Sequence, residues 1–229
     1  MISAISSLSG ISTINSVTVT SASITSDQLD ALLGSIVTVS GDVQISGVSV
    51  ESVSMPLLQT VGGDLQLISN TAVTTINFAN LTSINGSLTI TNNGVLWGTA
   101  MSNGFAQLQT VAGAVTLNTF SITGGAAAQT TLAVPTLTSI GSLDVRNTYL
   151  TTVSMPALQT IGGSGQQGLF SCQQMSFLRN LDFPSLATVS GRMSFGPSLP
   201  VLSNLCQVAL PLSGYMSSNA VRLAHLFCP

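Results

Sequence analysis

Charged side chains are scarce in this chain. Its 229 residues include seven acidic residues, four arginines and no lysine, which gives a formal net charge of −3. The charged share of 5% is about a fifth of that in ordinary soluble proteins, whereas 45% of the residues are hydrophobic. Disordered chains combine high charge with few hydrophobic residues, so this composition predicts a packed core. Four dispersed arginines are too few to neutralise a phosphate backbone or an anionic lipid surface, which excludes nucleic acid and such membranes as partners.

Long apolar runs are missing as well. No segment approaches the roughly 20 continuous apolar residues that span a bilayer, because Ser, Thr or Gly interrupts the chain every few positions. No membrane span is therefore expected. The first residues, Met1 to Ile5, lack the basic and apolar regions of a signal peptide, so we expect either a leader already removed or a piece of a longer protein.

Cysteine is rare, with three copies at Cys172, Cys206 and Cys228. Three are too few for a disulfide scaffold, and their spacing fits no metal site. A bridge between Cys206 and Cys228 is the favoured pairing, because both lie in the expected C-terminal cap. Three buried, reduced thiols are the alternative.

One internal repeat organises the chain. Each copy has a leucine, or isoleucine in a degenerate first copy, then Thr or Ser two residues later, then Val or Ile, then glycine and an alternating strand, as from Leu58 to Leu67 and from Leu81 to Ile90. Copies begin at Ile36, Leu58, Leu81, Leu108, Leu137, Leu158 and Leu186. The glycines predict corners with positive φ or close backbone approach, at Gly62, Gly86, Gly113, Gly141, Gly162 and Gly191.

A second signature closes the coils. It places an apolar residue three positions before another apolar residue, then Met or Phe two positions on, often followed by proline. Examples are Val50 to Pro56, Val73 to Ala79, Leu150 to Pro156 and Leu178 to Pro184. Proline cannot donate to a backbone ladder, so it marks the turn that leaves a strand.

These patterns predict an all-β fold, a parallel β-solenoid of about eight coils stacked roughly 4.8 Å apart. We expect one domain over residues 1–229, with regular coils over 30–205 and a cap over 206–229. A short helix is predicted from Ser26, as its N-cap, to Gly34, and a closing amphipathic helix from Ser217 to Phe227.

Together the two signatures resemble the receptor L-domain, found in receptor ectodomains and in fungal GPI-anchored cell-wall proteins. The best local matches are Phe183 to Gly191 and Met155 to Gly163, and the resemblance covers roughly residues 30 to 205. It implies a right-handed, leucine-rich-like solenoid that is displayed outside the cell for recognition or wall integrity.

Groups for catalysis are few, and no cofactor or metal is expected. The single histidine, His225, has no nucleophile or orienting carboxylate at a recognisable spacing, which favours a structural or surface role. Asp42 and Asp64 occupy equivalent positions on adjacent coils, where two carboxylates could share a proton or hold Ca²⁺. Solvated corner acids are the simpler interpretation, and a polysaccharide-active enzyme is the third functional hypothesis.

The most regular polar feature is a column of hydroxyl side chains, one in each copy: Thr38, Thr60, Ser83, Thr110, Ser139, Thr160 and Thr188. Such a ladder can bond along the stack or satisfy corner backbone groups. On a flat exposed side it could instead bind a surface such as ice. Variable coil length and mixed outward residues on the neighbouring strands argue against ice, which stays the alternative.

Two sequons, at Asn80 and Asn85, are candidate N-glycosylation sites in a secreted context. Trp97 lies in an insertion, where it either packs over its own loop or offers an aromatic surface to a ligand. Overall we expect a non-catalytic extracellular or cell-surface module with a structural or adhesive role. Its expected partners are glycans, other surface proteins or copies of itself.

Overall fold

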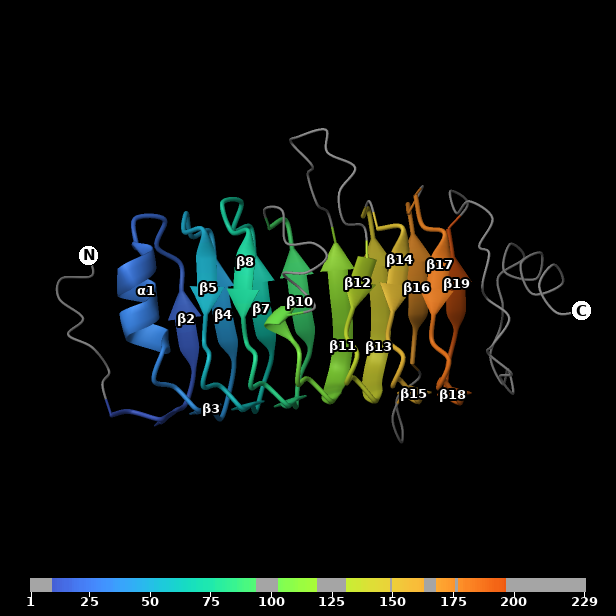
Figure 1. Cartoon of the computed structure of the whole chain (residues 1–229), viewed down its shortest axis with the longest axis horizontal. Coiled ribbons are helices and arrows are strands. Elements are labelled where there is room, and N and C mark those ends of the chain that lie inside the picture. Colours follow the sequence, from blue (N-terminus) through green and yellow to red (C-terminus); the bar gives the residue numbers. More distant parts are fainter. Residues whose placement is uncertain are drawn as a thin grey trace, which may run out of the picture.

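A computed structural model describes residues 10–93, 103–118, 131–148, 150–162, 168–175 and 177–196. They form a mostly β, parallel β-solenoid of about six turns with one short helix (Figure 1). The turns are fewer than the eight predicted. Helix α1 (Ser26–Leu33) stands between β2 and β3, where later coils carry a third strand, so the first coil is incomplete. Residues after 196 lie outside the described part.

Three rows of strands run along the stack, and each row forms one face. The narrow face contains β1 (Thr13–Ile14), β3 (Thr38–Val39), β6 (Thr60–Val61), β9 (Ser83–Ile84), the starts of β11 (Thr110–Asn118) and β13 (Ser139–Arg146), β15 (Thr160–Ile161) and β18 (Thr188–Val189). The broad face contains β2 (Val17–Val19), β4 (Val43–Ser46), β7 (Leu65–Ile68), β10 (Leu88–Thr91), the ends of β11 and β13, β16 (Phe170–Gln173) and β19 (Met193–Phe195).

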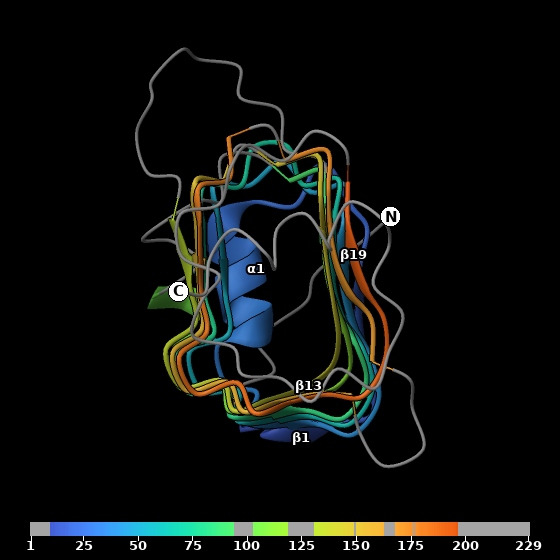
Figure 2. The ribbon, with the colours of Figure 1, turned by 90° about the vertical axis from the view of Figure 1, so that its right-hand side faces the viewer.

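The third face carries two separate sheets. One pairs β5 (Ser52–Ser54) with β8 (Thr75–Asn77), and the other runs β12 (Thr131–Ala133), β14 (Thr152–Ser154) and β17 (Asn180–Asp182). Between them Gly104 accepts the Phe78 N–H at 2.9 Å, and the Phe78 and Phe105 rings stack with centroids 5.5 Å apart. Viewed along the stack, the coils superpose on one rectangular outline (Figure 2).

Register between coils follows the repeat. Val61 pairs with Ile84, and Ile84 with Val111, and all three side chains are at most 1% exposed. The inward columns continue in one hydrophobic cluster from Val17 to Met193. A single coil has too few apolar residues to exclude water, so each depends on its neighbours for burial.

The second signature behaves as predicted. Met55, Phe78, Met155 and Phe183 are all buried, and each follows the short strand of the third face. The prolines after three of them begin turns and lead back toward the narrow face. The structure adds a copy that was not predicted, in which Leu132 and Val134 are buried and Pro135 begins the turn.

Close approach of the backbones of adjacent coils explains the glycines at the corners. At one corner the stacked glycine is the neighbour of the predicted one. Gly63, not Gly62, stacks on Gly86: the Gly63 N–H donates to the Gly41 carbonyl at 2.9 Å, and the Gly86 N–H to the Gly63 carbonyl at 2.9 Å. A Cβ on Gly86 would overlap the Gly63 backbone and the Asp64 carboxylate. Among the six predicted corner glycines, Gly162 alone has positive φ, at 98°.

The corner that leaves the broad face uses other residues. Left-handed φ values recur there at Gly47, Ser69, Asn92, Asn147 and Gln174, between 50° and 65°. The next column is buried and contains Asn70 and Asn93, which are 1% and 3% exposed. Asn70 Oδ1 accepts the Val48 N–H at 3.1 Å, while Nδ2 donates to the Ile45 carbonyl at 2.9 Å. Asn93 repeats both bonds one coil further on.

Helix α1 was predicted, but its N-cap was not. Thr25, rather than Ser26, is the N-cap: its side chain accepts the Gln28 N–H, and the Gln28 side chain accepts the Thr25 N–H in a capping box. Gly34 ends the helix as predicted. Leu29 and Leu33 are fully buried, and α1 contacts β5.

Several predictions concern residues outside the described ranges: the helix over 217–227, the cap over 206–229, the Cys206 to Cys228 bridge, His225 and Trp97. Among the helices of the described residues, none is long and apolar enough to cross a membrane.

Replacing Asn70 with alanine should destabilise the fold by about 2 kcal/mol, because a buried N–H and a buried carbonyl lose their partner. Urea unfolding measures this change. Asn85 is the matched control, since it is exposed and alanine there should change stability by less than about 0.5 kcal/mol. Equal unfolding midpoints for the two variants would contradict the role of the buried asparagine.

Candidate functional site

The hydroxyl column lies in register on the narrow face. Each predicted member pairs with the next across the stack, from Thr38 through Thr188. The structure adds Thr13 at the N-terminal end, paired with Thr38. Thr13, Thr110 and Thr188 are exposed and the others are half-buried. Parallel pairing places successive hydroxyls about 4.8 Å apart.

Within the described part of the chain these hydroxyls make no side-chain hydrogen bond, either to one another along the stack or to backbone groups at the corner. The preceding column behaves differently. Thr82 Oγ1 donates to the Gln59 carbonyl and Thr138 Oγ1 to the Gln109 carbonyl, both at 3.0 Å. Neighbouring hydroxyls thus hold the corner, while those of the narrow-face column remain available to solvent or to a ligand.

Small residues follow this column on one side of the narrow face, whereas the exposed Gln59, Gln109 and Gln159 directly precede three of its members. The next outward positions are Asn15, Ser40, Gly62, Asn85, Ala112, Gly141, Gly162 and Ser190. Among them only the two asparagines carry more than two side-chain heavy atoms. On the side that follows the column, the bordering side chains are therefore short.

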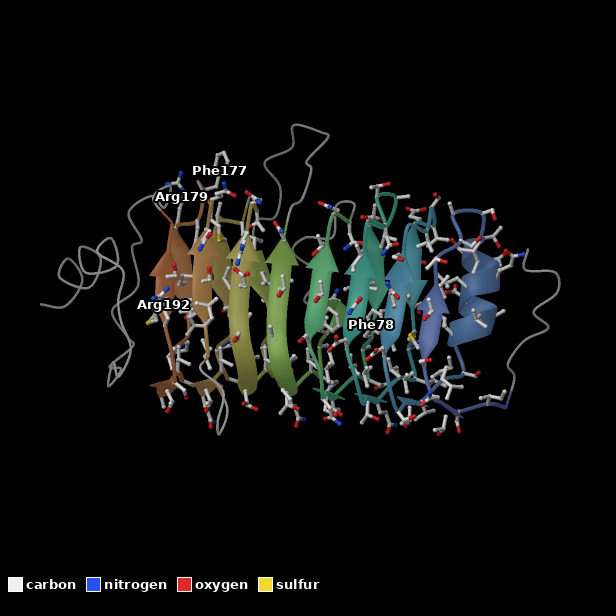
Figure 3. All side chains as sticks on the ribbon, turned by 180° about the vertical axis from the view of Figure 1, so that it is seen from behind. Phe78, Phe177, Arg179 and Arg192 are labelled. Carbon is white, nitrogen blue, oxygen red and sulfur yellow. The ribbon has the colours of Figure 1, made fainter. Side chains whose placement is uncertain are left out.

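The broad face has mixed chemistry (Figure 3). Its central column, at the positions that alternate outward, contains Thr18, Gln44, Gln66, Thr89, Thr116, Asp144, Ser171 and Ser194, of which Ser171 is fully buried. Asp144 binds Arg146 through both carboxylate oxygens, at 2.7 and 2.6 Å, and this ion pair raises the pKa of the Arg146 guanidinium. Repetition is thus weaker here than on the narrow face.

Asp42 and Asp64, which stack on adjacent coils, accept hydrogen bonds from backbone N–H groups. Asp42 Oδ1 accepts the Asp64 N–H at 2.8 Å, and Asp64 Oδ1 accepts the Ser87 N–H at 2.7 Å. Ser87 Oγ continues the series by accepting the Ala114 N–H at 3.2 Å. Each side chain therefore satisfies a donor on the next coil. Among the described residues no group of three or more potential metal ligands comes together.

The two sequons differ in environment. Asn80 Nδ2 donates to the Pro56 carbonyl at 2.7 Å, and its partner Thr82 donates to Gln59 as described above. Asn85 is exposed beside the hydroxyl column. A glycan on Asn85 would cover part of the narrow face.

Cys172 is fully buried and free. It pairs with Val145 on the inner side of the broad face, and burial raises the pKa of its thiol well above the usual range. The thiolate is therefore strongly disfavoured, and Cys172 is a small core residue.

Comparison with protein-family models, with curated proteins and with solved structures found no match for this chain.

Asp64→Ala should destabilise the fold by about 1 to 2 kcal/mol, because the Ser87 N–H loses its acceptor. Asp64→Asn keeps an acceptor oxygen and should cost less. Chemical denaturation of both variants measures the difference, and a smaller loss for alanine than for asparagine would disprove the backbone role.

Cys172 should react slowly with a thiol reagent at pH 8, because the reactive thiolate requires opening of the core. In a Cys206→Ser/Cys228→Ser variant, which keeps Cys172 as its only thiol, we expect labelling at least about 100-fold slower than in urea. Equally fast labelling of the folded variant would place this thiol outside the core.

Proposed function

We propose that this chain is a non-catalytic binding module of the cell surface or extracellular space, and that its narrow face contacts extended, neutral glycans. The supporting observation is the hydroxyl column from Thr13 to Thr188, which is in register and whose side chains make no hydrogen bond to any residue that the structure describes. The receptor L-domain resemblance, with its right-handed winding and a cap over 206–229, belongs to the same proposal.

Glycans fit this surface chemically. Sugar hydroxyls donate and accept hydrogen bonds, as Ser and Thr hydroxyls do, so a row of such groups can bond repeatedly along one chain. A neutral polysaccharide needs no charged partner, and the narrow face carries none among the column residues. Individual bonds are weak, and repetition along the solenoid supplies the affinity.

Removing two column hydroxyls tests this function. In Thr38→Val/Thr60→Val the shape is kept and two hydroxyls are lost. We expect binding to weaken about tenfold, since each bond contributes about 0.5 to 1.5 kcal/mol. Co-sedimentation with cellulose, chitin, mannan and β-glucan particles provides the measurement.

Thr89→Val/Thr116→Val is the matched control, because this pair is also stacked on adjacent coils but lies on the broad face. It should bind as the unmodified chain does. Equal losses in both variants, or no binding to any of the four polysaccharides, would overturn the proposed role of the narrow face.

Ice binding remains the second candidate, favoured by the same regular column. The coils differ in length, but this difference does not disturb the spacing of the hydroxyls, because the insertions leave the column in register. Ice binding would be supported in place of glycan binding if the purified chain shows thermal hysteresis and Thr60→Tyr or Thr110→Tyr abolishes it. A polysaccharide-active enzyme, the third hypothesis, requires turnover that is lost in Asp42→Asn or Asp64→Asn.

A further inference from the structure

A second period, of two coils, runs along one edge of the narrow face. The residues that directly precede Thr38 to Thr188 in the hydroxyl column also stack, because the N–H of each donates to the carbonyl of its equivalent one coil earlier, at 2.8 or 2.9 Å. We call this stack the edge column, and it contains Val37, Gln59, Thr82, Gln109, Thr138, Gln159 and Ala187. Glutamine therefore recurs on every second coil, with threonine on the coils between.

The hydroxyl column alternates in step with the edge column. Over the same five coils its members are Thr60, Ser83, Thr110, Ser139 and Thr160. Threonine thus follows each glutamine, and serine follows each edge threonine. The central column of the broad face shows no such order in these coils, where it contains Gln66, Thr89, Thr116, Asp144 and Ser171. The two-coil period therefore belongs to this edge of the narrow face and not to the coils as a whole.

The two kinds of edge residue present different groups to a ligand. The three glutamines are exposed, and their side-chain amides bond no residue that the structure describes. Thr82 and Thr138 are half-buried, and their hydroxyls already donate to the carbonyls of Gln59 and Gln109. A ligand along the axis therefore meets a column hydroxyl about every 4.8 Å and a free amide about every 9.6 Å.

Stacking of the coils does not require this alternation. Gln44 and Gln66 lie on adjacent coils of the broad face, so neighbouring glutamines fit the distance between coils. The Gln159 carbonyl accepts the Ala187 N–H at 2.9 Å without a hydroxyl beside it, so the corner also forms where the edge threonine is absent. Neither steric fit nor the corner backbone explains the period, whereas a ligand that repeats every two units does.

We propose that the narrow face binds a β-1,4-linked glycan of the cellulose or chitin type, with the sugar chain parallel to the solenoid axis. The inference rests on the glycan-binding function proposed above and names its ligand class. In such a glycan each sugar is turned over relative to the one before, so the chain repeats every two sugars, and one sugar is close in length to the step between coils. A glutamine amide both donates and accepts hydrogen bonds, so each can bond the groups that return to the same edge on every second sugar.

Isothermal titration calorimetry with soluble hexasaccharides tests the ligand class. Gln59 and Gln159 are four coil steps apart, about 19 Å, so cellohexaose and chitohexaose are long enough to reach all three glutamines. We expect one of these probes to bind at least about tenfold more tightly than laminarihexaose, whose β-1,3 links lack the flat two-sugar repeat. The tighter probe identifies the sugar. Equal or tighter binding of laminarihexaose would overturn the proposal.

Removing two amides tests the role of the glutamines. Gln59→Ala/Gln109→Ala should weaken binding of the tighter probe about tenfold, because two hydrogen bonds are lost. Gln44→Ala/Gln66→Ala is the matched control, since it removes two stacked amides from the broad face and should bind as the unmodified chain does. Circular dichroism confirms that each variant is folded. Equal affinities of the two variants would show that the edge glutamines do not bind the glycan.

Exchanging two edge residues tests the spacing itself. Gln109→Thr/Thr138→Gln keeps three glutamines but places two of them on adjacent coils, and binding should weaken about threefold because one amide leaves the two-coil period. Unchanged binding would overturn the role of the period.

These results are distinguishable from a failure of the proposed function. If Thr38→Val/Thr60→Val weakens glycan binding while both glutamine variants bind normally, the narrow face binds glycans without reading a two-sugar repeat. If the unmodified chain binds none of the hexasaccharides and none of the four polysaccharides, both proposals are wrong.

Discussion

The hydrogen bond from one coil to the next is the interaction on which this structure depends. A coil of two dozen residues has no internal sheet and no core of its own. Apart from a few bonds inside its turns, its N–H groups and carbonyls are satisfied by the coils before and after it, as when the Gly63 N–H donates to Gly41 and the Gly86 N–H donates to Gly63. The stability of the fold is therefore a sum of contacts between neighbouring coils. Any side chain that disturbs the stacking distance weakens the hydrogen bonds between its own coil and the next one.

Polar residues support this stacking at the corners, where strands cannot. Asn70 and Asn93 replace missing backbone partners inside the turn, while Asp42, Asp64 and Ser87 do so at the opposite end of the broad face. These side chains resemble functional residues in a sequence, because they are polar and recur at regular spacing. Their hydrogen bonds give them a structural explanation, which the column from Thr13 to Thr188 lacks among the described residues.

Periodicity made the fold predictable to a large extent. The parallel solenoid, the inward Val61, Ile84 and Val111, and the hydroxyl column followed from a repeat that lengthened only in its loops. Details set by a single hydrogen bond were missed. The pattern T-S-D-Q contains the capping box of Thr25 and Gln28, but Ser26 was equally plausible as a cap. Thr13 was not predicted as part of the column because its copy lacks the glycine that marks the others. The burial of Asn70 and Asn93 was not predicted because polar residues do not show up in a hydrophobic pattern.

The third face is divided into two separate sheets, and the level between them can accept longer connections between strands. Where Gly104 and Phe105 stand in place of a strand, no ladder joins β8 to β12 among the described residues, so extra residues there interrupt no described strand pairing. Two of the three longest intervals between repeat starts adjoin this level, with 27 residues from Leu81 to Leu108 and 29 from Leu108 to Leu137, and the third has 28 residues from Leu158 to Leu186. Lengthening a surface connection adds little loop entropy. New segments could therefore be inserted at this level while both continuous faces keep their spacing, which makes the middle of the rod its natural point of diversification.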